Sequence, residues 1–358
     1  MVDKEKISIF VAYKILRVNL NYLNLTYLSL IIMVQDSMKT KVVGVDVGYE
    51  ATTYAVVDVR GKILSKDSFQ SATIKSINDY ITILCDRITE MIDKNGGYEQ
   101  IRSIGISTPC GNYLSGNIES SGKLAWKGQI PLAAMMRDRL GLAVVVSNDA
   151  HARALGEFTY GCAHGMKDFL FITLGHGFGS CLFSNGRPHL GSEGFAGEVG
   201  HTFLLPAGRE CDCGGWGCLE SYCATDGIVK TAHELMESSD KPSMMRKCSN
   251  LTPKKITEFC DKGDEMAIEV YRRTGFILGL GLANYASVTD PEAIIITGGI
   301  ANAGHWLIDP MNASFEEHIF HNIKNQVKIV RSALKDDERN VLGASAVAWK
   351  VKEYSLFK

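Results

Sequence analysis

From residue 41 onward, apolar and polar positions divide the chain into short apolar runs and longer segments with helical spacing. The pattern of residues 42–107 predicts three strands, a helix and a fourth strand, at 42–48, 53–59, 62–69, 76–94 and 101–107. The first run is apolar apart from Asp46 and its glycines, which is typical of a buried strand with an acidic end. The order of these elements indicates the beginning of an α/β domain.

The rest of the chain continues this alternation. Its pattern predicts a helix at 132–140, a strand at 143–147 that leads into a helix, strands at 169–174 and 180–183, a helix at 266–288 and a strand at 293–297. Asn185-Gly186 predicts a two-residue hairpin turn. In both halves a strand passes through an acidic or glycine-rich turn into a second strand. This duplication predicts two related lobes, with chance similarity as the alternative for so weak a repeat.

Composition narrows the class of protein. The 358 residues exceed what one hydrophobic core usually holds, so we expect two domains. The net charge of -2 gives no field that would attract nucleic acid, and small-molecule chemistry is favoured. Most of the ten cysteines are scattered through apolar segments. Buried, reduced thiols fit this distribution better than disulfides and indicate a cytoplasmic protein.

The segment 1–37 differs from the rest. Its apolar stretch, 16–34, is interrupted by Arg17 and three asparagines, so it fits neither a membrane span nor the clean apolar core of a signal peptide. The sequence after Met38 resembles a natural start of the first domain. We therefore expect 1–37 to be a peripheral extension and the protein to have no membrane association.

One segment concentrates metal-binding side chains, because His201, Cys211, Cys213 and Cys218 fall within eighteen positions. Structural zinc is held tetrahedrally by Cys and His, and short Cys spacings allow two ligands to come from one turn. Glycines between the thiols permit the tight backbone that this requires. The segment predicts a structural zinc site, and free thiols or a disulfide pair are the alternative reading.

At this segment the chain resembles a known family. Glu198-Val-Gly200-His201, followed by Cys211-x-Cys213-Gly-x-x-Gly-Cys218-x-Glu220, is similar to the signature of the ROK family of repressors, open reading frames and sugar kinases. Three other motifs resemble family motifs and occur in the family's order: Asn148-Asp149-Ala150, Gly175-His-Gly177-Phe-Gly179-Ser and Thr297-Gly298-Gly299. Together the motifs cover residues 41 to about 350.

The resemblance implies a fold and its domains. The fold is the actin-like ATPase or hexokinase-type (ribonuclease H-like) pair of α/β domains, with ATP and sugar bound in the cleft between them. We expect the smaller domain to comprise 38–147 and a C-terminal helix at about 342–358. The larger domain, which carries the zinc loop, is expected at 148–341.

The resemblance also implies roles for individual residues. A glucokinase-like kinase phosphorylates a hexose, most simply glucose, with Asp149 as the base that takes the proton of the attacking hydroxyl. Sugar-binding residues are expected at Asn148, Asp149, Glu198, His201 and Glu220. Nucleotide phosphates are expected at Asp46, Gly48, Gly175, Gly177, Gly179, Gly298 and Gly299. Magnesium would accompany ATP near Asp46, zinc would be structural, and relatives are commonly homodimers.

Three positions depart from the family pattern. Tyr49 and Glu50 replace a glycine and a hydroxyl residue in the first phosphate loop, which puts efficient use of ATP in doubt. Lys123 stands where relatives have a sugar-binding Asn, and it can donate but not accept a hydrogen bond. His176 stands where Thr is usual in the second phosphate loop.

Two other functions therefore remain open. One is a sugar-binding ROK protein whose phosphoryl transfer is impaired through Tyr49 and Glu50. The other is a sugar-responsive regulator, which is disfavoured because the segment before the first strand is too short and insufficiently basic for a DNA-binding unit. The sequence does not distinguish one hexose or amino sugar from another.

Overall fold

A computed structural model describes residues 39–119 and 124–351. The predicted extension 1–37 and Lys123 lie outside these residues. The strands are β1 Lys41–Val47, β2 Ala51–Asp58, β3 Ile63–Gln70, β4 Ile101–Thr108, β5 Ala143–Asn148, β6 Phe169–Leu174, β7 Phe178–Ser184, β8 Arg187–Pro188, β9 Ala293–Thr297 and β10 Lys328–Arg331. The α-helices are α2 Ile77–Lys94, α3 Leu132–Leu140, α4 Asp149–Tyr160, α5 Glu220–Cys223, α6 Thr225–Glu237, α7 Pro253–Cys260, α8 Glu265–Thr289, α9 His305–His318 and α10 Arg339–Trp349.

The strands form two five-stranded sheets of identical topology. The strand order is β3-β2-β1-β4-β5 in the first sheet and β8-β7-β6-β9-β10 in the second. In each sheet the first three strands in sequence form an antiparallel meander. The last two strands run parallel to the first, on its other side. The duplication predicted from the sequence is therefore confirmed in the order and direction of the strands.

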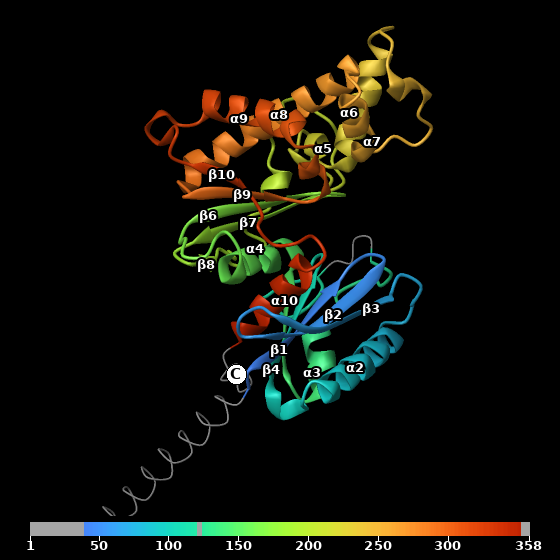
Figure 1. Cartoon of the computed structure of the whole chain (residues 1–358), viewed down its shortest axis with the longest axis vertical. Helices are drawn as coiled ribbons and strands as arrows, with labels where there is room; N and C mark the ends of the chain where they lie inside the picture. Colours follow the sequence, from blue (N-terminus) through green and yellow to red (C-terminus); the bar gives the residue numbers. More distant parts are fainter. Residues whose placement is uncertain (1–38, 120–123, 352–358) are drawn as a thin grey trace, which may run out of the picture.

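The helices arrange the two sheets in layers (Figure 1). Helices α2 and α3 cover the outer face of the first sheet, and α8 and α9 cover the outer face of the second. Helices α4 and α10 lie between the sheets. Each sheet shares a large apolar core with its outer helices, and smaller clusters join α4 and α10 to the strands. The α4–α10 layer therefore connects the lobes.

Helix α10 approaches strands β1 and β4 very closely at two glycines of the sheet. A Cβ atom added to Gly44 would lie 2.4 Å from the Val341 carbonyl oxygen, and one added to Gly105 would lie 2.0 Å from that of Ala344. Such distances do not occur for real Cβ atoms, so the close approach requires glycine at both positions. This approach carries the beginning of α10, at Arg339 and Asn340, to the space between the lobes.

Helices α4 and α10 also cross at glycines. A Cβ atom on Gly156 would lie 3.0 Å from the Gly343 Cα, and one on Gly343 would lie 2.7 Å from the Ala152 carbonyl oxygen. The backbones of the two helices are therefore in direct contact at this point.

The predicted pair of α/β lobes is present. The domain boundaries stay a prediction, and the nearest structural landmarks are the end of β5 at Asn148 and the start of α10 at Arg339, slightly before the expected position near 342. Among the residues that the structure describes, no helix combines the length and the apolar character that crossing a membrane requires.

Candidate active site

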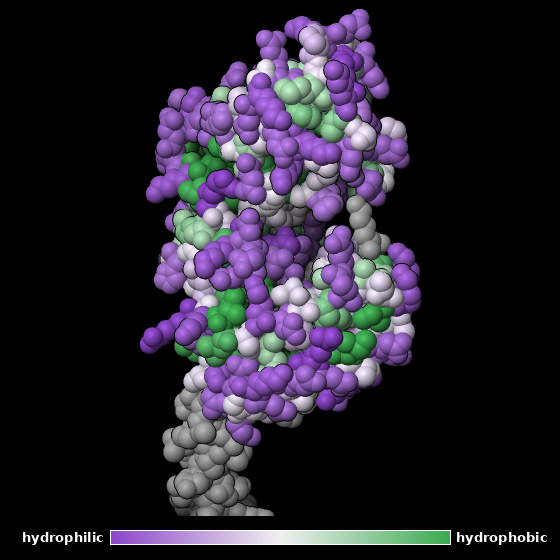
Figure 2. Space-filling model, turned by 45° about the vertical axis from the view of Figure 1, so that its right-hand side comes forward, coloured by the Kyte–Doolittle hydropathy of each residue, from purple (hydrophilic) through white to green (hydrophobic). Residues whose placement is uncertain are grey.

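A cleft of about 650 Å³ lies between the lobes, a size typical of small-ligand sites. In Figure 2 the surface is hollowed between the two lobes, and hydrophilic residues border the hollow. The predicted site residues that line the cleft are Asn148, Asp149, Gly175, Gly177, Gly179, Glu198, His201, Glu220, Gly298 and Gly299. The predicted residues Asp46 and Gly48 are not among its lining residues, although the adjacent Tyr49 is. The fold thus brings together segments that lie far apart in the sequence.

Asp149 stands at the first position of α4, where the helix meets the cleft. Asn148 is the N-cap, and its side-chain oxygen accepts hydrogen bonds from the backbone N–H groups of Ala150 and His151. Because Asn148 fills the capping role, the Asp149 carboxylate is not required for it. Asp149 Oδ2 lies 3.2 Å from Arg153 Nη2, one helical turn further along. The carboxylate is partly exposed, so a ligand in the cleft can reach it.

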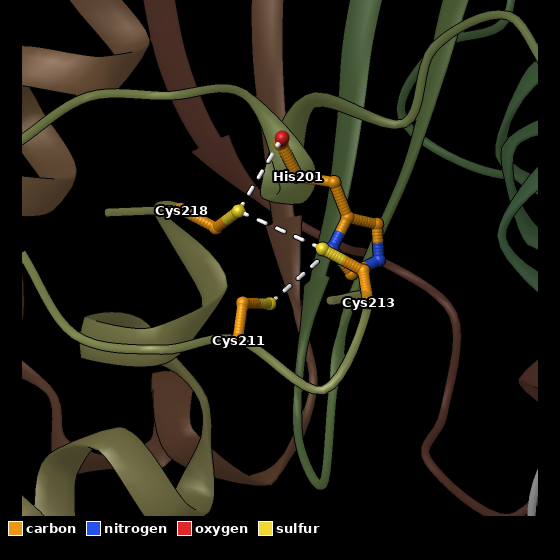
Figure 3. A group of neighbouring side chains, drawn as sticks. All are labelled: His201, Cys211, Cys213 and Cys218. Atoms are coloured by element: carbon orange, nitrogen blue, oxygen red, sulfur yellow. Dashed lines mark hydrogen bonds between the residues drawn. The ribbon is translucent and has the colours of Figure 1, made fainter. Parts of the chain in front are cut away.

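The predicted zinc ligands converge at one point (Figure 3). The ligand atoms of His201, Cys211, Cys213 and Cys218 all lie within 4.8 Å of one another. The sulfur atoms of Cys213 and Cys218 are 3.7 Å apart, and Cys211 Sγ is 3.7 Å from His201 Nδ1. Two sulfurs that each bind zinc at about 2.3 Å with tetrahedral geometry lie about 3.8 Å apart. The spacing and donor types therefore fit a tetrahedral zinc ion.

The loop that carries the thiols is held in a small hairpin by two isolated bridges, Phe203 with Cys218 and Glu210 with Trp216. Gly217 has a φ of +66° and its Cα faces the Leu205 carbonyl, 2.1 Å from where a Cβ would stand. Only glycine fits this position, which confirms the sequence-based reading of a tight backbone between the thiols.

Glu198 and Glu220 line the cleft together with His201. Burial raises the pKa of Glu198, the nearby His201 opposes this rise, and the carboxylates of Asp149 and Glu220 add to it. Glu220 begins α5, and its Oε2 accepts a 2.6 Å hydrogen bond from the Phe178 backbone N–H. Its other oxygen lies 4.0 Å from His201 Nδ1. Glu220 thus connects the cysteine loop to the glycine-rich turn.

The glycine-rich turn joins β6 to β7. The Gly175 N–H donates to the Gly177 carbonyl, and both the N–H and the hydroxyl of Thr225 donate to the Gly175 carbonyl. Together with Glu220, these bonds fix the turn in position at the wall of the cleft. The turn therefore lies at the wall of the cleft, and its role as a phosphate-binding loop stays a prediction.

Asp46 does not line the cleft, but hydrogen bonds connect it to residues that do. Its Oδ1 accepts from Ser107 Oγ at 3.1 Å, and its Oδ2 accepts from Asn340 Nδ2 at 2.9 Å. Asn340 in turn accepts a 3.0 Å bond from Arg153 Nε. Burial raises the pKa of Asp46, and the Arg153 guanidinium opposes this rise. A polar chain thus runs from Asp149 through Arg153 and Asn340 to Asp46.

The two substituted positions of the first loop behave differently. Glu50 is exposed and is not among the lining residues of the cleft. Tyr49 lines it, and its pKa is raised by partial burial and by the carboxylates of Asp149 and Glu220. His176 also lines the cleft.

Arg153, Arg339 and Asn340 are among the cleft residues that sequence reasoning missed. The sequence did contain a signal for Arg153. Asp149 is the first residue of its helix, and a residue four positions later lies on the same helix face. For Arg339 and Asn340 the sequence carried no signal, because their role depends on contacts with α4 and β1 across the molecule.

Comparison with known proteins adds independent findings. A model of the ROK family matches residues 42–351. The glucokinase of Halalkalibacterium halodurans is 31% identical to this chain over 321 residues, which are 87% of this chain and 94% of that protein. The Escherichia coli DNA-binding transcriptional dual regulator NagC is 25% identical over 331 residues, which are 88% of this chain and 77% of that protein.

Solved structures share the fold. A ROK family glucokinase from Streptomyces griseus, in complex with glucose and AMPPNP, matches with a TM-score of 0.71 at 27% identity, over 87% of this chain and 100% of that one. The ROK hexokinase of Thermus thermophilus matches with a TM-score of 0.75 at 25% identity, over 86% of this chain and 98% of that one. These likenesses confirm the predicted actin-like ATPase fold of hexokinase type.

Proposed function

Because the chain belongs to the ROK family, we propose that it is an ATP-dependent hexose kinase with glucose as its acceptor. The observation that carries the proposal is the single cleft in which Asp149 lies with the acids and the histidine of the cysteine loop and with the glycine-rich turn. A base, acceptors for sugar hydroxyls and a phosphate-binding turn are the parts that transfer to an alcohol requires. The similarity to glucokinases supports the choice of substrate.

In the proposed reaction Asp149 accepts a hydrogen bond from the attacking hydroxyl and takes its proton as the oxygen bonds to phosphorus. Asn148 caps α4 and so holds the backbone at Asp149. Glu198, Glu220 and His201 bind further hydroxyls of the sugar and fix its orientation. Orientation matters because transfer requires the attacking and leaving oxygens to be in line.

The four residues His201, Cys211, Cys213 and Cys218 would hold zinc. With four protein ligands and no open position, such an ion is structural, and it would fix the cysteine loop and the orientation of the imidazole. The Nδ1 atom of His201 faces the thiols, which leaves Nε2 for a ligand in the cleft. Asp46 would be nearest to magnesium, which would offset the charge of the ATP phosphates. A homodimer and a cytoplasmic location remain predictions from the sequence.

The second candidate is a sugar-binding protein with impaired transfer. Two observations favour it. Tyr49, which belongs to the first loop, lines the cleft, and Asp46 is not among the lining residues. A regulator without kinase activity is the related alternative, supported by the similarity to NagC.

Assays of ADP release with a panel of hexoses, together with melting curves in sugar alone and in MgATP alone, separate these candidates. The kinase proposal expects turnover with glucose. Asp149→Asn should lower kcat by about 10²–10⁴-fold, the usual contribution of a general base, and leave the melting temperature near that of the native protein. Stabilisation by sugar without turnover would support the second candidate instead. Full activity of Asp149→Asn would show that the base is misassigned.

A further inference from the structure

The Arg153 guanidinium contacts one carboxylate directly and is linked to a second through Asn340. Its Nη2 is 3.2 Å from Asp149 Oδ2, and its Nε donates at 3.0 Å to Asn340, whose amide donates to Asp46 at 2.9 Å. The Arg153 side chain is 16% exposed and lines the cleft. In the proposed reaction Asp149 contacts the acceptor hydroxyl, whereas Asp46 is not among the residues that line the cleft and connects to Arg153 through Asn340. Arg153 therefore places a cation in the cleft directly beside the proposed base.

Arg339 supplies a second cation from the same side of the cleft. Its Nη2 is held by the Leu334 carbonyl and the Asp336 carboxylate. Its Nε is buried and finds no hydrogen-bond partner among residues 39–119 and 124–351. A buried donor without a partner is costly, and an arriving acceptor removes that cost. The α4–α10 side of the cleft thus holds two guanidinium groups and an unused donor.

Charge is distributed unevenly over the cleft. Its carboxylates, Glu119, Asp149, Glu198 and Glu220, suit the hydroxyls of a sugar and repel an anion. The arginines among its lining residues are Arg153 and Arg339. A guanidinium presents five N–H donors in a planar fork that matches phosphate oxygens, and among the described residues Arg153 bonds through Nε and Nη2. The arginine side is therefore the part of the cleft that suits a phosphate.

We propose that Arg153, assisted by Arg339, binds the terminal phosphate of the donor nucleotide and neutralises its charge during transfer. This inference rests on the proposed kinase function and assigns an additional residue to it. As the sugar oxygen bonds to phosphorus, the bond from phosphorus to the ADP oxygen breaks, ADP keeps the electron pair and Asp149 takes the hydroxyl proton. Arg153 stays protonated throughout and exchanges its contact with Asp149 for one with the phosphate.

The test uses the full chain with glucose present. Calorimetry measures the affinity for Mg·AMPPNP, and ADP release from MgATP measures turnover. Arg153→Gln should weaken Mg·AMPPNP binding at least about tenfold and lower kcat by about 10³-fold, the lower end of the range for arginines that stabilise a transferring phosphoryl group. Glucose affinity should change little. Arg153→Lys should have a nucleotide affinity and a kcat between those of the native protein and Arg153→Gln, because it keeps the positive charge but loses the planar fork of donors.

Controls separate a phosphate contact from a purely structural role. Asn340→Ala breaks the Arg153–Asn340–Asp46 chain and keeps the cation, so it should affect nucleotide affinity far less than Arg153→Gln. Added guanidinium ion should partly restore turnover to Arg153→Ala, an effect that a lost structural contact would not produce. Melting curves of each variant verify the fold, and Arg153→Lys keeps the inference testable if the neutral variants do not fold.

The outcomes are distinct. Unchanged nucleotide affinity and turnover in Arg153→Gln would overturn the inference and leave the kinase proposal standing. Faster turnover in Arg153→Gln would also overturn it, by identifying Arg153 as an obstacle. Nucleotide binding that depends on Arg153 without ADP release would support the inference and contradict the kinase function. A native protein that binds no Mg·AMPPNP would contradict both.

Discussion

Asp46 is a half-buried carboxylate whose ionisation affects the proposed reaction. Its pKa is raised by burial, and Arg153 lowers it in part. Only the ionised carboxylate attracts magnesium, so kcat/KM should fall as the pH decreases through a pKa above the ordinary value of about 3.9. The neighbours Ser107 and Asn340 are neutral donors, and Asp149 is a further acid that raises the pKa.

A pH profile of kcat/KM checks this sign, with Arg153→Gln as the comparison. Removing the cation removes a contribution that lowers the pKa, so the acid limb of the variant should move to higher pH. An acid limb at the same pH in both proteins would show that Asp46 does not control it.

At this scale the sequence indicated which motif residues the fold brings together, but not the charge balance around them, and the roles of these residues as zinc ligands and base stay predictions. His201, Asp149 and the thiols belong to short motifs whose spacing is visible along the chain. The charge balance at Asp46 depends on Asn340, which is 294 positions away. No local pattern relates two such residues, because only the packing of α10 on the first sheet brings them together.

The cysteine loop is the element on which sugar binding is expected to depend. Cys213→Ser, or removal of zinc with a chelator, should lower the zinc content and weaken glucose binding by about 10-fold or more, because an ion that orients ligands commonly contributes this much. Cys248→Ser is the matched control, since Cys248 lies outside the cluster. Zinc analysis and glucose calorimetry on the same samples provide the measurement. Equal glucose affinity in zinc-free and zinc-loaded protein would refute the link between loop and pocket.

Elements with a strong apolar pattern were predicted closely. The helix expected at 266–288 is α8, Glu265–Thr289, and the strand expected at 293–297 is β9, Ala293–Thr297. Helix α9 was missed, and it contains Pro310, which a sequence reading takes as a helix boundary. The short edge strand β10, Lys328–Arg331, has exposed ends and only two apolar residues. Such an element is stabilised by its neighbour in the sheet rather than by its own pattern.

The packing of α10 on the first sheet determines how the whole molecule is assembled. Gly105→Ala would force a methyl group to within 2.0 Å of the Ala344 carbonyl oxygen, so α10 must shift. We expect a loss of about 1–3 kcal/mol or more of unfolding free energy, as for other overpacked cores. Gly299→Ala is the control, because a Cβ there meets nothing within 4 Å. Urea unfolding of both variants measures the difference, and equal stability would show that α10 adjusts freely.

The two lobes themselves were foreseeable from chain length and from the repeated strand scheme. Their mutual placement was not, since it follows from α4 and α10 meeting through glycines in the middle of two ordinary helices. In a sequence, a glycine within a helix usually indicates a less stable helix. Here the glycines allow two helix backbones to touch, and that role is visible only in the three-dimensional structure.

The crossing of α4 and α10 has a mechanical consequence. Where the helices touch, at Gly156 and Gly343, backbone meets backbone. Side-chain hydrogen bonds also join the two helices, from Arg153 to Asn340 and between Tyr160 and Ser345. A side chain in place of either glycine would push the two helices apart. The cleft opens beside this contact, at the starts of the same two helices. The glycine pair therefore sets the distance between the two helices whose first residues, Asp149 and Arg339, line the cleft.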